Sequence, residues 1–281
     1  MTGNAQVVRG SWVTLLVAGS LLTGCSGQTT DKGAVRESTS GTAPSSASAQ
    51  ADASPSATAT PSGSSSAASA VFTPDASLVP KTSKDGRRLT DSVVLAPGDW
   101  GRGYVAQAPA VSTPGTWAVL DKDCHWEREK LPHGVLASTS RYSRLPAGAG
   151  KGAVRVTAVA TVHGSVLGAD EQLSTTLEEV LRCPEQLPRS EERITGLMSL
   201  GTPFGAREQE YADDSVLEAG TYVGSGGSGQ PYRWMVARLG TVVVAVSVTG
   251  GAGNTEQDLN ELGSKALAKM LTRIEQRLKG N

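Results

Sequence analysis

The chain has 281 residues, 38% of them hydrophobic and 4% aromatic, so it is long enough to form a domain with its own core. Its 26 Lys and Arg residues balance 27 Asp and Glu residues, which gives a formal net charge of −1. This balance excludes the strongly basic class of nucleic-acid-binding proteins, and we expect no nucleic-acid partner.

The first 25 residues have the organisation of a bacterial lipoprotein signal. Arg9 precedes an apolar run at 12–22, which is shorter than the roughly 20 apolar residues that span a membrane. A Leu-Thr-Gly-Cys motif at 22–25 resembles the lipobox of that family. The resemblance implies a signal peptide over residues 1–24, acyl chains such as palmitate on Cys25, and a location on the outer face of the cell membrane. A plain secretory signal with a chance cysteine is the alternative.

Residues 25–84 are predicted to form a disordered linker. Between 38 and 70, every residue except Gln50 and Asp52 is Ser, Thr, Ala, Pro or Gly, so the segment has too little apolar surface to offset its ordering entropy. A flexible coil of about 45 residues spans roughly 35–40 Å on average. A glycosylated, mucin-like stalk is the alternative interpretation. Four basic residues near its end are interpreted as solvated linker: Lys81, Lys84, Arg87 and Arg88.

Two further cysteines, Cys124 and Cys183, remain once the lipobox cysteine is acylated. In an oxidising compartment an even pair of cysteines is predicted to form a disulfide. Closing a loop of about 60 residues would stabilise the fold by about 4 kcal/mol. A zinc site that includes His125 is a competing interpretation, as are free thiols, but no Cys-x-x-Cys or His-x₃-His spacing supports zinc. We therefore expect no metal and no cofactor. Trp117 and Trp126 flank the first cysteine and are expected to pack against the disulfide.

Strand and helix patterns follow one another in the second half of the chain. Residues 153–162 alternate between apolar and polar side chains, which predicts a half-buried antiparallel strand. Leucines at helical spacing predict a helix over 170–182, ended by the Cys-Pro pair. Shorter patterns predict strands at 193–200 and 216–223.

A hairpin and a long helix complete the chain. Strands are predicted at 232–238 and 241–249, joined by a Leu-Gly turn. Thr255 is a candidate N-cap with Asp258 three residues further on, and a leucine-rich helical pattern follows to the C-terminus. These elements predict an α+β domain over 85–281, in which an antiparallel twisted sheet carries two helices on one face.

The order of these features resembles a known family. A Leu-Ala-Pro-Gly segment at 95–98 precedes Cys-His-Trp at 124–126, and a helix leads into Arg-Cys-Pro at 182–184, before the valine hairpin and the last helix. This order is similar to the extracellular sensor domain of mycobacterial PknH-type kinases and to stand-alone lipoproteins like it. The resemblance covers 85–281 and implies a cleft beside the sheet and ligand or partner binding. That family generally has two disulfides, whereas one cysteine pair is present here. PsbP-like α+β lipoproteins are a second candidate.

Motifs that would identify a reaction are lacking. The glycine-rich run at 224–229 fits G-x-G-x-x-G, but a proline and a strand follow it instead of a helix, so it is interpreted as a hairpin loop. The adjacent carboxylates Glu178 and Glu179 are interpreted as a solvated helix face, and Asp213 and Asp214 as a turn. The histidines show no metal-ligand spacing: His125, His133 and His163.

The sequence therefore predicts a membrane-anchored extracytoplasmic lipoprotein that is not an enzyme. Its partners would be the membrane, through the lipid anchor, and a small ligand or an envelope protein bound by the folded domain. A cell-envelope hydrolase or transferase without a recognisable motif is the alternative from another class, and a purely structural envelope protein is a third.

Overall fold

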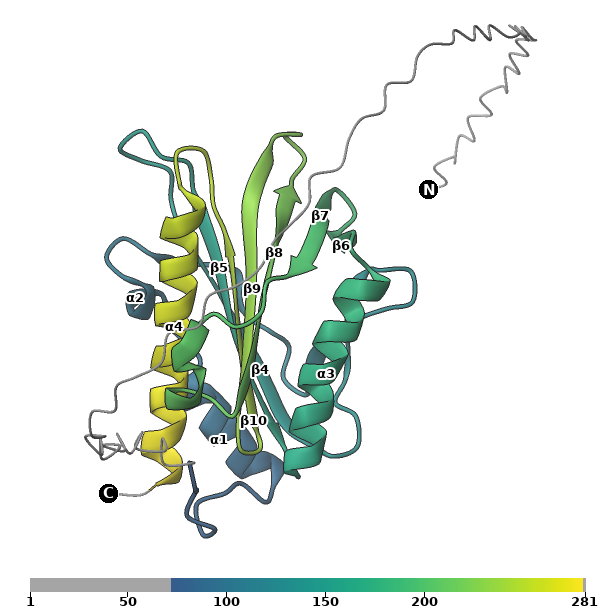
Figure 1. Ribbon diagram of the computed structural model, residues 1–281, viewed down its shortest axis with the longest axis vertical. Coiled ribbons are helices and arrows are strands. Elements are labelled where there is room, and N and C mark those ends of the chain that lie inside the picture. The colour runs from purple at the N-terminus through teal and green to yellow at the C-terminus, as the bar shows by residue number, and fades with distance from the viewer. Residues whose placement is uncertain (1–71, 280–281) are drawn as a thin grey trace, which may run out of the picture. The chain divides into compact units, whose positions relative to one another are not determined.

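The computed structural model describes residues 72–279, which form one α+β domain (Figure 1). The signal peptide, Cys25 and most of the predicted linker lie outside the described residues. Within the described part of the chain, no helix has both the length and the apolar character needed to cross a membrane.

The domain is built on an antiparallel sheet of eight strands in the order β1-β4-β5-β10-β9-β8-β7-β6, with a separate two-stranded sheet formed by β2 and β3. The strands have these bounds: β1 Val105–Val111, β2 Thr116–Leu120, β3 Trp126–Lys130, β4 Val135–Leu145, β5 Val154–His163, β6 Gln186–Arg189, β7 Glu192–Ser199, β8 Asp214–Val223, β9 Gly229–Leu239 and β10 Val242–Thr249.

The centre of the sheet is the predicted valine hairpin. β9 and β10 pair in continuous register, with Val244 opposite Ala237, and β10 pairs on its other side with β5. Gly240 lies in the turn between the hairpin strands with a φ of 59°, a conformation that glycine adopts without a steric penalty. The glycine-rich run at 224–229 joins β8 to the start of β9, so it is a hairpin loop as expected.

Four α-helices and one 3₁₀ helix connect or flank the strands. Their bounds are α1 Ser83–Val93, α2 Pro97–Trp100, α3 Val166–Arg182, α4 Glu256–Leu278 and the 3₁₀ helix η1 Gly205–Glu210. α3 begins earlier than predicted because Ser165 is its N-cap and accepts a hydrogen bond from the Gly168 N–H. At the start of α4, Thr255 and Asp258 form the expected capping box.

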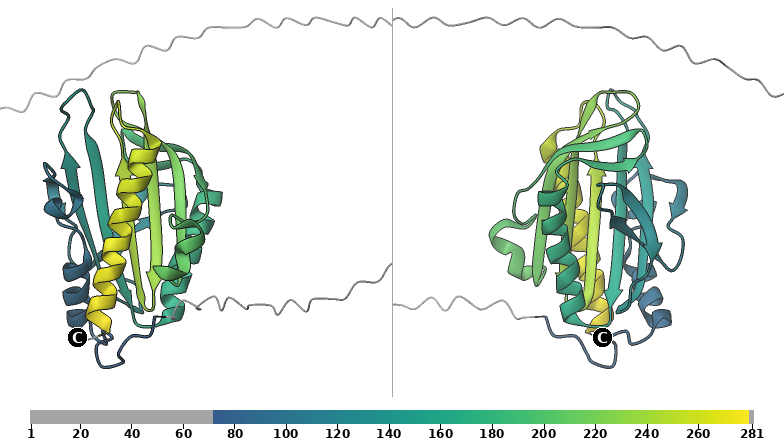
Figure 2. Two further views of the ribbon diagram at one scale, coloured as in Figure 1. Left: turned by 60° about the vertical axis from the view of Figure 1, so that its left-hand side comes forward. Right: turned by 90° about the vertical axis from the view of Figure 1, so that its right-hand side faces the viewer.

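The helices lie on both faces of the sheet (Figure 2). Two helices share one face, but they are α1 and α4, whereas α3 packs on the opposite face. The prediction that α3 and α4 share a face is therefore wrong. β10 explains why, because Val244 and Val246 point to the core under α4, while Val243 and Ala245 point to the core under α3. A strand that is apolar on both sides is covered on both sides.

The N-terminal boundary of the fold also differs from the prediction. α1 begins at Ser83, inside the range assigned to the linker, and Thr82 caps it by accepting a hydrogen bond from the Asp85 N–H. Further upstream, the Asp75 N–H donates to the Leu278 carbonyl at 2.7 Å. The segment from 72 to 84 is therefore part of the domain.

Candidate functional site

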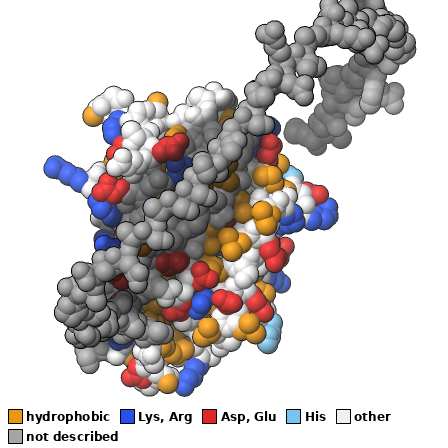
Figure 3. All heavy atoms as spheres, in the orientation of Figure 1, with side chains coloured by type: hydrophobic (Ala, Val, Ile, Leu, Met, Phe, Trp, Pro, Cys, Tyr) orange, Lys and Arg blue, Asp and Glu red, His pale blue; other side chains and the backbone are white. Residues whose placement is uncertain are grey.

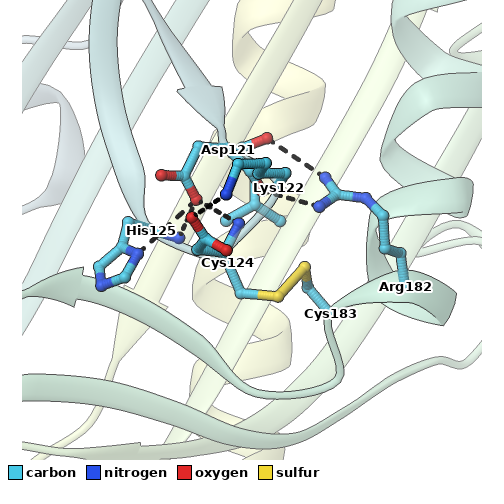
Figure 4. A network of polar contacts seen from close by, with 8 residues as sticks. Asp121, Lys122, Cys124, His125, Arg182 and Cys183 are labelled. Carbon is cyan, nitrogen blue, oxygen red and sulfur yellow. Dashed lines mark hydrogen bonds and ion pairs between the residues drawn. A yellow bond between two sulfur atoms is a disulfide. The ribbon is translucent and has the colours of Figure 1, made fainter.

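The predicted cysteine pair joins two distant elements at one corner of the domain. Cys124 lies in the turn between β2 and β3, and Cys183 directly follows α3. Their sulfur atoms are 2.08 Å apart and form a disulfide across 59 positions of sequence (Figure 4). The bond fixes the C-terminal end of α3 to the β2–β3 hairpin.

Hydrogen bonds around the disulfide hold the β2–β3 turn in place (Figure 4). The Asp121 carboxylate accepts from the backbone N–H groups of Asp123 at 2.9 Å and His125 at 2.8 Å. Because these bonds stabilise the charged form, led by the one from His125, the pKa of Asp121 is lowered. From α3, the Arg182 guanidinium donates to the Asp121 and Leu120 carbonyls. No group of three metal-ligating side chains occurs among the described residues.

The aromatic side chains near this corner pack against each other. The Trp126 ring lies 6.3 Å from that of Trp234 on β9, and its indole N–H donates to the Gln186 side chain at 2.8 Å. Trp117 pairs with Glu129 across the β2–β3 hairpin. The corner therefore links α3, the hairpin and the sheet into one packed unit.

Two glutamates, one on α3 and one on the sheet beneath it, have the carboxyl groups whose pKa values depart furthest from the ordinary value. Glu218 on β8 is 2% exposed, and its Oε1 atom has no hydrogen-bond partner among the described residues. Burial, followed by repulsion from Glu179 of α3, raises its pKa to about 8. Burial raises the pKa of Glu179 to about 7, against a smaller opposing effect of Arg182. The neighbouring Tyr232 is buried too, and its pKa is also raised, mainly by burial.

This carboxyl pair keeps protons near neutral pH because it is shielded from water. A general acid has to reach the substrate, whereas Glu218 is covered by α3 and the surrounding side chains. The pair therefore supports a role in pH-dependent stability rather than in catalysis. The interpretation of Glu179 as a solvated helix residue is wrong, since its side chain lies partly buried near Glu218.

A hollow of about 400 Å³ lies beside α1, on the other face of the domain from α3's core. One wall is a stripe along α1 that includes Arg87 and Asp91, and the opposite wall is the end of β1 with the turn that follows it. β4 forms the floor. The lining residues are Ser83, Arg87, Asp91, Val111, Ser112, Pro114, Gly115, Leu131, Leu136, Ala137, Ser138 and Thr139.

Two residues of β4 in the lining carry hydroxyl groups, which point to opposite faces of the sheet, Thr139 toward α1 and Ser138 toward Thr161. Ser138 and Thr139 are both 7% exposed, and each is held by a neighbour: Ser138 by Thr161 at 3.0 Å and Thr139 by Thr90 at 2.8 Å. The Arg87 guanidinium on the wall is exposed and has no ion-pair or hydrogen-bond partner among the described residues. The hollow therefore combines Thr139 on its floor with one charge of each sign on its wall, the exposed Arg87 guanidinium and the Asp91 carboxylate, which accepts a hydrogen bond from Thr139 at 3.3 Å.

Sequence reasoning did not find this hollow. The basic group that contains Arg87 was interpreted as solvated linker, because a helix at α1 was not predicted. One signal was present, the run Ser-Thr-Ser at 138–140, since three buried hydroxyls in a row are uncommon in a strand. The other singled-out groups have local partners: His163 is buried against Gln172 at 2.7 Å, and Asp213 binds Arg238 at 2.9 Å.

Comparison with known proteins gives one distant structural neighbour. No protein-family model matches the chain, and no curated protein matches it. A solved structure of an uncharacterized protein from Mycobacterium smegmatis, described as an Rv0999 ortholog, is 14% identical over 50% of this chain and 68% of that one, with a TM-score of 0.29. This likeness is too distant to support an argument about function.

Proposed function

We propose that this protein is a membrane-anchored extracytoplasmic lipoprotein whose α+β domain binds a ligand or partner without catalysing a reaction. The hollow beside α1 is the observation that carries the binding half of the proposal. Its described lining contains no histidine, cysteine or paired carboxylates, so it offers groups that bind and orient a ligand rather than an acid–base pair.

The location rests on two cysteine features. The lipobox supplies the acylation site at Cys25, and acyl chains anchor a protein because each buried CH₂ contributes about 0.8 kcal/mol. The Cys124–Cys183 disulfide is typical of proteins that fold outside the cytoplasm. Both features favour the outer face of the membrane.

The chemistry of the hollow favours a polar ligand that carries both hydroxyl groups, which Asp91 can accept from, and an anionic group, which Arg87 can bind. Small hydroxyl side chains such as Ser112 and Thr139 match the hydroxyls of a sugar, and the unpaired Arg87 guanidinium suits a phosphate or carboxylate. Sugar phosphates and acidic oligosaccharides are therefore the ligand class that fits best.

A titration followed by NMR tests the binding site. Sugar phosphates and acidic oligosaccharides should shift the amide signals of Ser112, Thr139 and their neighbours, and Arg87→Glu should abolish these shifts. Lys122→Glu, an exposed reversal at the β2–β3 turn, is the matched control and should bind as the parent protein does. Shifts spread evenly over the surface, or shifts that survive Arg87→Glu, would show that the hollow is not the site.

Processing in cells tests the anchor independently. Inhibition of signal peptidase II, or the Cys25→Ser substitution, should leave a larger precursor in the bacterial cell. An unchanged band under both treatments would refute acylation at Cys25 while leaving the binding site untouched.

A further inference from the structure

One end of the domain is the place where the N-terminal segment joins it. The described chain begins here at Phe72, and Asp75 hydrogen-bonds to Leu278 at the end of α4. The Gly164 N–H donates to the Gly134 carbonyl at 2.7 Å, which brings the loops before α3 and β4 together at the same end. Figures 1 and 2 show the starts of α1 and α3 and the end of α4 at the same end of the domain, with α3 on the opposite face of the sheet from α1 and α4. We call this region the tether-side end: residues 72–84, 131–135, 163–167 and 275–279.

Positive charge at the tether-side end is not neutralised by its neighbours. Lys81 and Lys84 are exposed and have no partner among the described residues. The acidic residues nearby have local partners, because Asp85 accepts a hydrogen bond from the Thr82 hydroxyl and pairs with Arg88, and Asp75 accepts two hydrogen bonds from Ser77. An anionic surface that approaches this end therefore meets free lysines.

Apolar side chains are also exposed at this end of the domain. Leu78 is 40% exposed, Val166 is 51% exposed and Leu167 is 67% exposed. The last two belong to the first turn of α3, which contains no acidic residue, so the positive end of its helix dipole is uncompensated. Figure 3 shows hydrophobic side chains along the side of the molecule that α3 forms. Exposed apolar and basic side chains on one surface are the pattern of proteins that lie in a membrane interface.

We propose that the tether-side end docks on the anionic surface of the membrane in which the proposed lipid anchor at Cys25 is embedded. The membrane is the partner of this end because residues 25–71 connect the described domain, at Phe72, to the proposed anchor. Tethering makes the contact intramolecular, so an affinity too weak to recruit a free protein is sufficient. Docking would orient the domain, with the β4–β5 and β8–β9 loops pointing away from the bilayer.

Vesicle sedimentation tests the proposal without the acyl chains on which the anchor depends. The chain from Ser26 onward should bind vesicles that contain phosphatidylglycerol, bind pure phosphatidylcholine vesicles much less, and dissociate as salt is raised. Lys81→Glu with Lys84→Glu should weaken binding at least about 25-fold, since each removed cation costs about fivefold. Val166→Ser with Leu167→Ser should weaken it as well.

The matched control reverses two exposed lysines elsewhere, Lys122→Glu with Lys151→Glu, and changes the net charge equally. It should retain binding, and circular dichroism should show all variants folded. Any of three results would overturn the proposal. The protein does not bind anionic vesicles, the control variant loses as much binding as Lys81→Glu with Lys84→Glu, or the protein forms a dimer in solution that Leu167→Ser disrupts. An unchanged band in the processing assay would instead refute acylation at Cys25 alone, because the vesicle assay measures binding by the domain surface without acyl chains.

Discussion

Glu218 places a carboxyl group in the buried interior of the domain. Its side chain is 2% exposed, and one oxygen lacks a partner among the described residues. A buried ionised carboxylate would be strongly destabilising, so the folded state holds the proton instead. Glu179, on the helix above, adds like charge as soon as it ionises.

This arrangement predicts that stability falls as pH rises. The folded pKa of about 8 lies above the ordinary value of 4.5, so between about pH 5 and pH 8 the unfolded chain releases a proton that the folded chain keeps. Stability is therefore highest below this window, and the loss is complete above it. Glu218→Gln, which is neutral at every pH, should flatten the decline and stabilise the fold at pH 8 by roughly 2–4 kcal/mol.

Urea unfolding across this pH range measures the effect. Glu178→Gln is the matched control, because Glu178 is exposed on α3 next to Glu179, and its substitution should shift stability by less than about 0.5 kcal/mol. A Glu218→Gln profile as steep as that of the parent protein would show that another group controls the pH dependence.

At the scale of elements, α3 is held at both ends and along one buried stripe. Ser165 caps its start, and the Cys124–Cys183 disulfide fixes its end to the β2–β3 hairpin. Between them, one stripe of α3 is buried against the sheet, whereas Leu177 and Leu181 are exposed; the stripe consists of Ala169, Leu173, Thr176 and Val180. The disulfide adds a covalent attachment to this packed stripe at the C-terminal end of the helix.

Removal of the disulfide should therefore destabilise the domain. The double variant Cys124→Ala with Cys183→Ala should lose about 4 kcal/mol of unfolding free energy, because the unfolded chain regains the freedom of a loop of about 60 residues. Denaturant unfolding measures the loss, and the parent protein under reducing conditions should show a similar one. If neither treatment lowers the midpoint, the bond does not stabilise the fold.

At the scale of the whole molecule, the domain begins about a dozen residues before the boundary drawn from the sequence. A chain that starts at Phe72 keeps the Thr82 cap and the Asp75 contact with α4. A chain that starts at Asp85 loses both, and should be less stable by at least about 1 kcal/mol, the usual contribution of one N-cap.

Thermal unfolding of the two truncated chains decides where the domain starts. Thr82→Ala in the longer chain isolates the cap and should account for part of the difference. Equal stability of the two chains would place 72–84 outside the folded unit and restore the earlier boundary.

The sequence by itself determined the elements whose signals are local. Alternation of apolar residues predicted β5 and the β9–β10 hairpin, and the capping box predicted the start of α4, because each pattern reflects contacts within one element or one turn. The cysteine count predicted the disulfide by elimination, since the expected acylation of Cys25 leaves two candidates.

Only the tertiary structure decided which face each helix covers, which groups are shielded from water, and where the candidate site lies. α3 and α4 have similar leucine stripes, and the choice of opposite faces came from β10, which is apolar on both sides. Glu179 resembled a solvated helix residue until β8 placed Glu218 near it. Likewise, the hollow joins α1 to β4, which begins more than 40 residues after α1 ends. Burial and electrostatic coupling depend on such distant neighbours, and one segment of sequence does not contain them.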